Sequence, residues 1–457
     1  MTRRAGALAA LGLVMMGSGC GSWQRVGSPD RAAPGTVMPR LFDATSVYRS
    51  MGFLATAGPL PFVASVRYLR GPAPDSTLAL FSLSLANSAL TFQRTGPEFV
   101  AAYRVEAIFR RDSSLVPMRH IARDEQVRVR SFQETLRGDE SVIFQQFVTL
   151  PAGAYLVNVM VRDRNGPAFS RTERVDTVPD LWRRSGLTRP IPIYQAVART
   201  QPAVMPALLA NPRATLPYGS DTLRFYVEGY GVTSGARVVA RVIDGSDREL
   251  WRDTVALRGD GNIATATIAV GPDRLPVGQA EMVTTPAGGG DTTRSRFLVS
   301  FSNQWVITNF EEMISLLRYF EAQTWVDSLR KASPADRPAM WRQFWKATDP
   351  VTLTPENEGL DDYFRKVQQA NIRFADEGEP GWLTDRGEVL ITIGEPDEVL
   401  DMSNGMDRSG LRAIRWTYST LRVVLYFQDQ TGFNHFKLTP TSRAEYQRAL
   451  ARVRRSR

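Results

Sequence analysis

The stretch from residue 142 to residue 161 reads V-I-F-Q-Q-F-V-T-L-P-A-G-A-Y-L-V-N-V-M-V. Its two ends, 142–150 and 155–161, are runs rich in β-branched and aromatic residues, in which apolar residues recur with the period of a strand. Pro151 and Gly153 between them are residues typical of tight turns. The stretch therefore predicts two strands joined by a short turn, in a chain built mainly from β-sheets.

Similar runs before this stretch predict a first β-domain over residues 42–180. They are Phe62–Leu69, Thr77–Leu85 and Phe99–Phe109. The segment from Leu150 to Tyr155 resembles the start of a late strand in Ig-like β-sandwiches, where a tyrosine packs near a corner of the fold. This resemblance implies that the first domain is an Ig-like β-sandwich.

A second block of strand patterns predicts another Ig-like sandwich over residues 218–302. The expected strands are short and regularly spaced, as in such domains: Thr222–Gly229, Ala236–Ile243, Leu250–Leu257, Asn262–Val270, Gly278–Thr284 and Arg294–Phe301. Residues 181–217 are rich in proline between the two blocks and are predicted to be a linker.

From residue 303 the apolar period changes to that of helices. Thr308 with Glu311 forms the pattern of a capping box, and Ser333-Pro334 and Thr354-Pro355 each place a capping residue before a proline. We therefore expect three helices. Their inward faces would carry Phe310, Met313, Ile314, Leu317 and Phe320, then Met340, Trp341, Phe344 and Trp345, then Leu360, Tyr363, Phe364, Val367 and Phe374.

The aromatic group Trp341, Phe344 and Trp345 allows two interpretations. Aromatic side chains close together can form a cage around a ligand. At helical spacing they more often belong to a hydrophobic core. The spacing favours the core.

The segment 381–398 reads G-W-L-T-D-R-G-E-V-L-I-T-I-G-E-P-D-E. Gly381 and Gly387 permit backbone conformations that side chains forbid. Thr384 and Asp385 are short acceptors able to bond nearby amides in a turn, above a buried Trp382. Residues 389–393 are then expected to form a buried strand, closed by a tight turn at Gly394, Pro396 and Asp397.

This segment resembles the GWxTD domain, which is named after the motif and belongs to bacterial envelope proteins without a defined activity. Phe344–Asp349, Thr354–Glu358, Tyr363, Asn371 and Arg415-Trp416-Thr417-Tyr418 also fit the family pattern. The resemblance covers about residues 303–440. It implies a helical segment followed by a small antiparallel sheet, to which Trp416 contributes. Residues 441–457 are predicted to be a basic C-terminal helix or tail.

Two functions are compatible with these residues. Asp385, Glu388, Glu395, Asp397 and Glu398 lie close in sequence, and two carboxylates can act as acid and base in glycoside hydrolysis. A glycan-active hydrolase is therefore one alternative. Asp385 looks instead like a turn former, however, and Asp397 and Glu398 like a solvated loop.

No serine or cysteine completes a catalytic triad near His120 or His435, the two histidines of the chain. Metal ligation by His435 with the acids is conceivable, but no cofactor is expected. The favoured hypothesis is a non-catalytic binding or scaffolding protein whose partners are envelope proteins or cell-wall polymers.

The N-terminus predicts a lipid anchor. Arg3 and Arg4 precede an apolar run at 5–16, which is shorter than the ~20 residues that cross a bilayer. Cys20, the single cysteine, follows Gly17-Ser18-Gly19 and resembles a lipobox cysteine, although Gly17 stands where leucine is usual. Residues 1–19 are then a signal peptide and 20–41 a tether. This resemblance implies a lipoprotein of the cell envelope, and Gly21 favours the outer membrane, facing the periplasm.

Composition is that of a globular chain, with 43% hydrophobic and 23% charged residues. The formal charge of +9 falls to +7 when Arg3 and Arg4 are removed with the signal peptide. Because the arginines are spread along the chain, they predict a solvated basic surface. An envelope location argues against nucleic acid as a partner.

Overall fold

The computed structural model divides the chain into two compact units, one within Val37–Gln369 and one from Ala370 to the C-terminus. Each is described by itself. The predicted signal peptide, Cys20 and the tether lie outside the described residues, which are 44–111, 114, 116–138, 142–220, 222–233, 235–259, 262–302, 305–351, 356–374, 379–402 and 412–456.

The first sandwich consists of two antiparallel sheets that enclose one core. Its first sheet contains β1 (Leu54–Thr56), β2 (Phe62–Arg70), β3 (Thr77–Leu85) and β7 (Val142–Leu150). Its second sheet contains β4 (Gln93–Thr95), β5 (Glu98–Arg111), β6 (Pro117–Val129), β8 (Gly153–Asp163) and β9 (Phe169–Val178). Alternate residues of both sheets, among them Phe81 and Phe109, are fully buried between them. Two short helices, α1 (Ala44–Ser50) and α2 (Phe132–Thr135), flank the sheets.

The turn at 151–153 carries the chain from one sheet to the other. β7 pairs with β3 in the first sheet, whereas β8 pairs with β5 and β9 in the second. Tyr155 is fully buried, and its hydroxyl donates to the Pro151 carbonyl at 3.0 Å. This bond back to the preceding turn is the geometry of the tyrosine corner, so the expected role of Tyr155 is confirmed.

The second sandwich contains the predicted strands and four more. One sheet holds β10 (Gly186–Leu187), β11 (Ile191–Val197), β12 (Ala207–Ala210), β14 (Leu223–Tyr230) and β17 (Ile263–Val270). The other holds β13 (Thr215–Pro217), β15 (Arg237–Asp244), β16 (Glu249–Ala256), β18 (Gly278–Pro286) and β19 (Thr293–Ser300). β13 lies parallel to β19. Phe225 and Phe297 meet in the core between these sheets, with ring centroids 5.4 Å apart.

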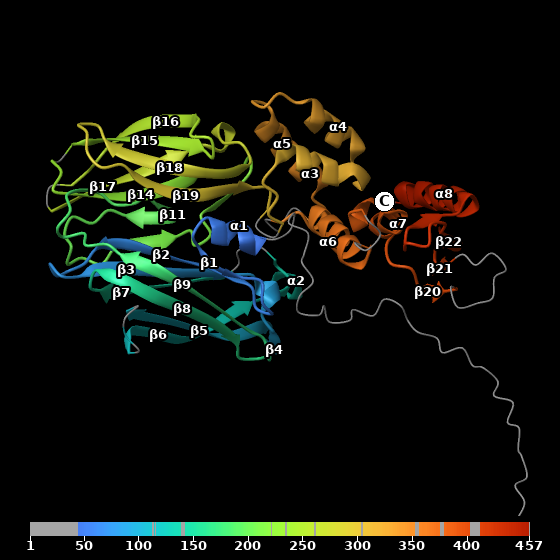
Figure 1. Ribbon diagram of the computed structural model, residues 1–457, viewed down its shortest axis with the longest axis horizontal. Coiled ribbons are helices and arrows are strands. Elements are labelled where there is room, and N and C mark those ends of the chain that lie inside the picture. Colours follow the sequence, from blue (N-terminus) through green and yellow to red (C-terminus); the bar gives the residue numbers. More distant parts are fainter. Residues whose placement is uncertain are drawn as a thin grey trace, which may run out of the picture. The chain divides into compact units, whose positions relative to one another are not determined.

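The prediction of a linker at 181–217 is wrong, because these residues form β10 to β13. Their apolar side chains cover the outer face of the first sandwich: Leu69, Leu78 and Leu80 pack with Ile191, Ile193, Leu208, Ala210 and Tyr226. β3 is consequently buried on both faces. Figure 1 shows the result, two sandwiches stacked as four layers of strands.

A buried ion pair lies where the sandwiches meet. Arg199 binds Glu228 with two hydrogen bonds, of 2.6 and 2.8 Å, and donates to the Arg70 carbonyl of the first sandwich at 2.9 Å. The hydroxyls of Tyr226 and Tyr230 also donate to Glu228. Because every partner is hydrogen-bonded, these charges tolerate complete burial.

In the described residues between 305 and 374, the chain forms helices α3 (Phe310–Leu316), α4 (Gln323–Lys331), α5 (Arg337–Thr348) and α6 (Glu358–Phe374). The expected inward faces are confirmed, since Met313, Leu317, Phe344 and Val367 are fully buried. Two predicted starts are wrong, because Asn309 rather than Thr308 caps α3, and α5 begins at Arg337 rather than at Ser333. The expected start at Thr354 lies outside the described residues.

The aromatic group on α5 belongs to the core. Trp341 lies against Phe301 of the second sandwich, with ring centroids 4.5 Å apart, and Phe344 is fully buried. Within the described parts of the chain, every helix is too short or too polar to traverse a bilayer.

The C-terminal unit combines a four-stranded antiparallel sheet with two helices. The sheet contains β20 (Glu398–Asp401), β21 (Arg412–Tyr418), β22 (Val423–Asp429) and β23 (Phe436–Leu438), and the helices are α7 (Asp385–Ile393) and α8 (Pro440–Ser456). The expected strand at 389–393 is wrong, because this run lies in α7. Thr384 caps the start of α7, and Gly394 ends it at a φ of +90°, which glycine adopts without strain.

Candidate functional site

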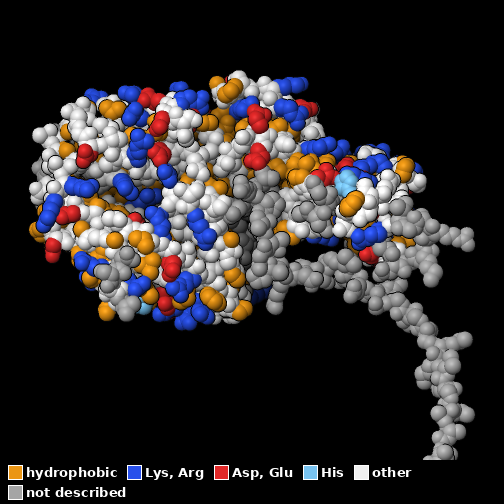
Figure 2. Space-filling model, viewed as in Figure 1, with side chains coloured by type: hydrophobic (Ala, Val, Ile, Leu, Met, Phe, Trp, Pro, Cys, Tyr) orange, Lys and Arg blue, Asp and Glu red, His pale blue; other side chains and the backbone are white. Residues whose placement is uncertain are grey.

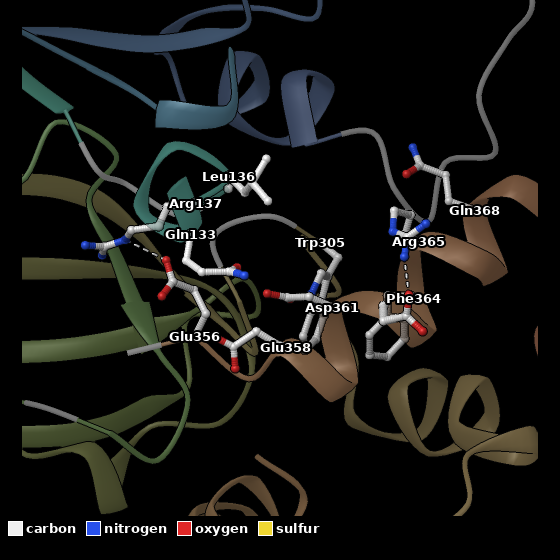
Figure 3. Close-up of a pocket in the computed structure, with 12 residues that line it drawn as sticks. Gln133, Leu136, Arg137, Trp305, Glu356, Glu358, Asp361, Phe364, Arg365 and Gln368 are labelled. Atoms are coloured by element: carbon white, nitrogen blue, oxygen red, sulfur yellow. Dashed lines mark hydrogen bonds and ion pairs between the residues drawn. The ribbon is translucent and has the colours of Figure 1, made fainter. Parts of the chain in front are cut away.

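The first sandwich and the helical segment enclose a pocket of about 430 Å³. The loop after α2 forms one wall and α6 the other. Figure 3 shows Gln133 of α2 pointing toward Asp361 of α6. Its lining combines aromatic, acidic and basic side chains: Gln133, Leu136, Arg137, Gly138, Trp305, Glu356, Glu358, Asp361, Asp362, Phe364, Arg365 and Gln368.

The carboxylates around this pocket hold its walls together. Glu356 accepts from Arg137 Nε at 2.7 Å, which joins the two walls. Asp361 accepts from Trp305 Nε1 at 2.8 Å. Asp362 pairs with Arg365 and with Lys366. These acids therefore hold the walls of the pocket in place.

Glu358 and Asp349 form a carboxyl pair beside the pocket. Burial raises the pKa of Asp349, and the hydrogen bond and negative charge of Glu358 raise it further. Two carboxyls in direct hydrogen-bond contact are too close to flank a glycosidic bond, which requires a separation of about 5 Å or more.

This pair predicts a pH dependence. The pKa of Asp349 is higher in the folded state than in the unfolded state. Protonated Asp349 therefore stabilises the folded state at low pH, and this stabilisation is lost as the pH rises through the raised pKa. After the change Asp349→Asn, the side chain can still donate a hydrogen bond to Glu358. Unlike a carboxyl group, the amide does not have to bind a proton first. We expect a flatter pH dependence of the urea midpoint as the pH rises above the ordinary aspartate pKa of about 4. Asp327→Asn, which changes an exposed acid paired with Arg330, is the control and should keep the wild-type profile.

An exposed apolar surface lies on the β11–β12 hairpin, in the segment predicted to be a linker. We call Tyr194, Val197, Val204, Met205 and Leu209 the hairpin patch; their exposures run from 36% for Leu209 to 65% for Val197. A groove of about 850 Å³ runs along the same hairpin to Arg224 and Thr267. Exposed apolar groups beside a groove are typical of protein-binding surfaces. The alternating pattern of apolar residues around Val197 and Leu209 could have indicated strands in this segment. The proline content of the segment instead favoured a linker.

In the C-terminal unit, the motif glycines are required by close packing. A Cβ on Gly381 would lie 2.2 Å from the Ala370 carbonyl oxygen, and one on Gly387 would lie 2.0 Å from the Gly381 carbonyl oxygen. Neither glycine has a positive φ. The expectation that they adopt conformations forbidden to other residues is therefore wrong. Glycine is needed at both positions because the neighbouring backbone leaves no space for a Cβ atom.

Trp382 and Thr384 fix the turn before α7. The Trp382 amide donates to the Asn371 side chain at 3.1 Å, and the residue is only 5% exposed. The Thr384 hydroxyl donates to the Gly381 carbonyl at 2.8 Å and accepts from the Gly387 amide at 3.0 Å. The predicted roles of these two side chains in the turn are confirmed.

Asp385 connects α7 to β23 and α8. It accepts from the Leu438 amide at 2.7 Å and pairs with Arg443 at 2.6 Å. Glu388, one turn later, pairs with the same arginine at 2.9 Å. Burial lowers the pKa of Arg443, but hydrogen bonds and charge from Glu388 and Asp385 outweigh it and leave that pKa raised.

The second half of the motif secures the sheet. The Gly394 carbonyl accepts from the Tyr418 hydroxyl at 3.0 Å, and Asp397 accepts from the Ser419 amide at 2.6 Å. Pro396 is half-buried between them. Trp416 is 2% exposed, with its ring centroid 4.8 Å from that of Phe427.

The remaining acids of the motif are also engaged. Glu395 pairs with Arg373, and Glu398 pairs with Arg415 at 3.1 Å. All five acids considered for catalysis therefore bind an arginine or a backbone amide. In this arrangement they orient neighbouring elements.

The two histidines lie apart from these acids. His435 Nε2 is 3.3 Å from Glu379, which Lys437 also contacts, and His120 lies 3.9 Å from Glu106 in the first sandwich. Among the described residues, His, Cys, Asp and Glu side chains form no group of three suited to a metal ion.

Comparison with known sequences addresses the origin of the motif. The family model described as the GWxTD domain matches residues 289–453. The chain contains a GWxTD domain. The match begins in the turn before β19 and ends in α8, so the GWxTD domain extends beyond the expected 303–440 and includes the helices α3 to α6. No curated protein matches the chain.

Two solved structures give weak likenesses. One is trypsin-activated alpha-2-macroglobulin from Escherichia coli, at 11% identity and a TM-score of 0.18 over 55% of this chain and 17% of that one. The other is the BSP domain of a biofilm-associated protein, at 8% identity and a TM-score of 0.16 over 56% of this chain and 54% of that one. This chain therefore spans less than two thirds of either structure, and the low scores leave its function open.

Proposed function

We propose that this chain is a non-catalytic binding protein of the bacterial cell envelope, anchored by lipid at Cys20. The observation that carries the proposal is the engagement of the motif acids. Asp385, Glu388, Glu395, Asp397 and Glu398 are each bonded to an arginine or an amide. A general acid or base must instead reach a substrate proton.

The partner we propose is another envelope protein. The hairpin patch supports this choice over a wall polymer, because exposed Val197, Met205 and Leu209 offer apolar area rather than hydrogen bonds. Burying Val197 and Leu209 against a partner would contribute about 1–3 kcal/mol each. The stacked sandwiches hold this hairpin on a fixed surface.

Affinity capture from solubilised envelope tests the proposal. The tagged wild-type chain is compared with the double variant Val197→Lys and Leu209→Lys. We expect the wild type to retain a defined protein and the double variant to retain at least about tenfold less, which corresponds to ~1.4 kcal/mol. The control variant, Val116→Lys with Val175→Lys, changes two other exposed valines and should match the wild type.

Other outcomes would change the proposal. Capture that is lost after enzymatic digestion of the wall would identify a polymer as the ligand. If no protein is retained and the purified chain releases sugars from wall glycan, the chain is a hydrolase.

Cys20→Ala should release the protein from the membrane fraction; retention would mean that another contact also holds it.

A further inference from the structure

The C-terminal helix α8 has two contrasting faces. Ser442, Tyr446, Ala449 and Leu450 are buried against α7, β22 and β23. The exposed face carries arginines at positions 448, 452, 454 and 455. Arg448, Arg452 and Arg455 lie four and three residues apart, so they form one row about 10 Å long.

The positive charge of this face is only partly balanced. Arg448 pairs with Glu445 at 3.1 Å, and Glu445 is the only acid of the helix. Among the residues that the structure describes, no carboxylate pairs with Arg452, Arg454 or Arg455. Arg443, in contrast, faces inward and neutralises Asp385 and Glu388. Figure 2 shows basic side chains on the surface over α8.

We propose that the arginine row of α8 binds the anionic phospholipid headgroups of the membrane. A guanidinium presents several donors that match phosphate oxygens. Because the apolar face of α8 is already buried within its own unit, the helix can lie on a bilayer surface without inserting into it. The contact is therefore electrostatic, and salt weakens it.

Proximity favours lipid over other anions, and this step rests on the proposed anchor at Cys20. A lipid-held chain would thus keep its basic surfaces at a high effective concentration beside headgroups. Each arginine at an anionic surface strengthens binding about fivefold.

Vesicle sedimentation of residues 21–457 tests the proposal without the acyl chains and retains every described residue. The vesicles contain either phosphatidylcholine alone or a 3:1 mixture with phosphatidylglycerol. We expect binding to the mixed vesicles only, with a large decrease between about 50 and 500 mM salt. Replacing Arg448, Arg452 and Arg455 by glutamine should weaken binding about a hundredfold.

A matched control removes the same charge elsewhere. Arg258, Arg274 and Arg318 are exposed arginines far from α8 in sequence, and their glutamine variants should bind within about threefold of the wild type. Thermal unfolding verifies that all variants are folded. The proposal would be overturned if both triple variants weakened binding equally, or if the chain bound neutral vesicles as well as mixed ones. It would also be overturned if α8 bound purified wall polymer and the chain did not bind vesicles. The vesicles contain no protein, so this result is independent of the capture experiment.

Discussion

Glu228→Ala is expected to destabilise the stacked sandwiches by about 3–5 kcal/mol, because it leaves the Arg199 charge buried without its partner. The side chains of Arg199 and Glu228 are 1% and 0% exposed. Burial lowers the pKa of Arg199, but hydrogen bonds and charge from Glu228 outweigh it and raise that pKa above its ordinary value. Alanine would also leave the hydroxyls of Tyr226 and Tyr230 without their acceptor. Chemical denaturation should report the loss as a lower midpoint.

The control for this change is an ion pair of the same residue types at the surface. Arg252 donates to Glu249 at 2.8 Å, with side chains 56% and 37% exposed. Glu249→Ala should leave the denaturation midpoint close to that of the wild type, because exposed ion pairs contribute little to stability. A Glu228→Ala variant as stable as Glu249→Ala would mean that water reaches Arg199. In that case the ion pair would not hold the sandwiches together.

The strands were predictable wherever period and composition agreed. Expected and observed bounds coincide for β3 and β7, and they differ by only a few residues for β14 to β19. β6 and β9 were not predicted because their outward positions carry charged residues such as Arg123 and Glu173. Their backbone partners in β5 and β8 supply the pairing that local composition does not show.

The largest errors arose where tertiary contacts outweigh local preference. Pro190, Pro192 and Pro202 suggested a linker, yet β11 and β12 form because they cover Leu78 and Leu80 of β3. The run 389–393 has β-branched residues, but the Thr384 cap starts a helix and acids in its first turn favour it.

The candidate sites also differ in how far the sequence alone predicts them. Trp382 and Thr384 act within a short segment, so their roles could be inferred from sequence. The pocket joins Arg137 to Glu356, 219 residues apart, and nothing local in the sequence signals that contact. The hairpin patch required knowledge of which face of β11 and β12 is covered.

Gly387→Ala is the second change with a large expected effect, and it separates packing from helix propensity. Gly387 lies in the first turn of α7, where alanine would by propensity alone stabilise the helix by up to about 1 kcal/mol. The added Cβ, however, would lie 2.0 Å from the Gly381 carbonyl oxygen and 3.0 Å from the Trp382 Cα. Both contacts involve backbone, so the turn 381–383 must move away from α7.

We therefore expect Gly387→Ala to destabilise the C-terminal unit by about 3 kcal/mol, at the upper end for overpacking. Displacing the turn would also break the Thr384 bond to Gly381 and expose Trp382, whose burial is part of the same packing. Hydrogen exchange measured by mass spectrometry should show faster exchange in peptides covering α7, with strands of the sandwiches unchanged. Gly271→Ala is the control, because a Cβ there meets nothing within 4 Å. Slower exchange in α7 of the Gly387→Ala variant would mean that helix propensity dominates and that the motif glycine is not needed for the close approach of the two backbones.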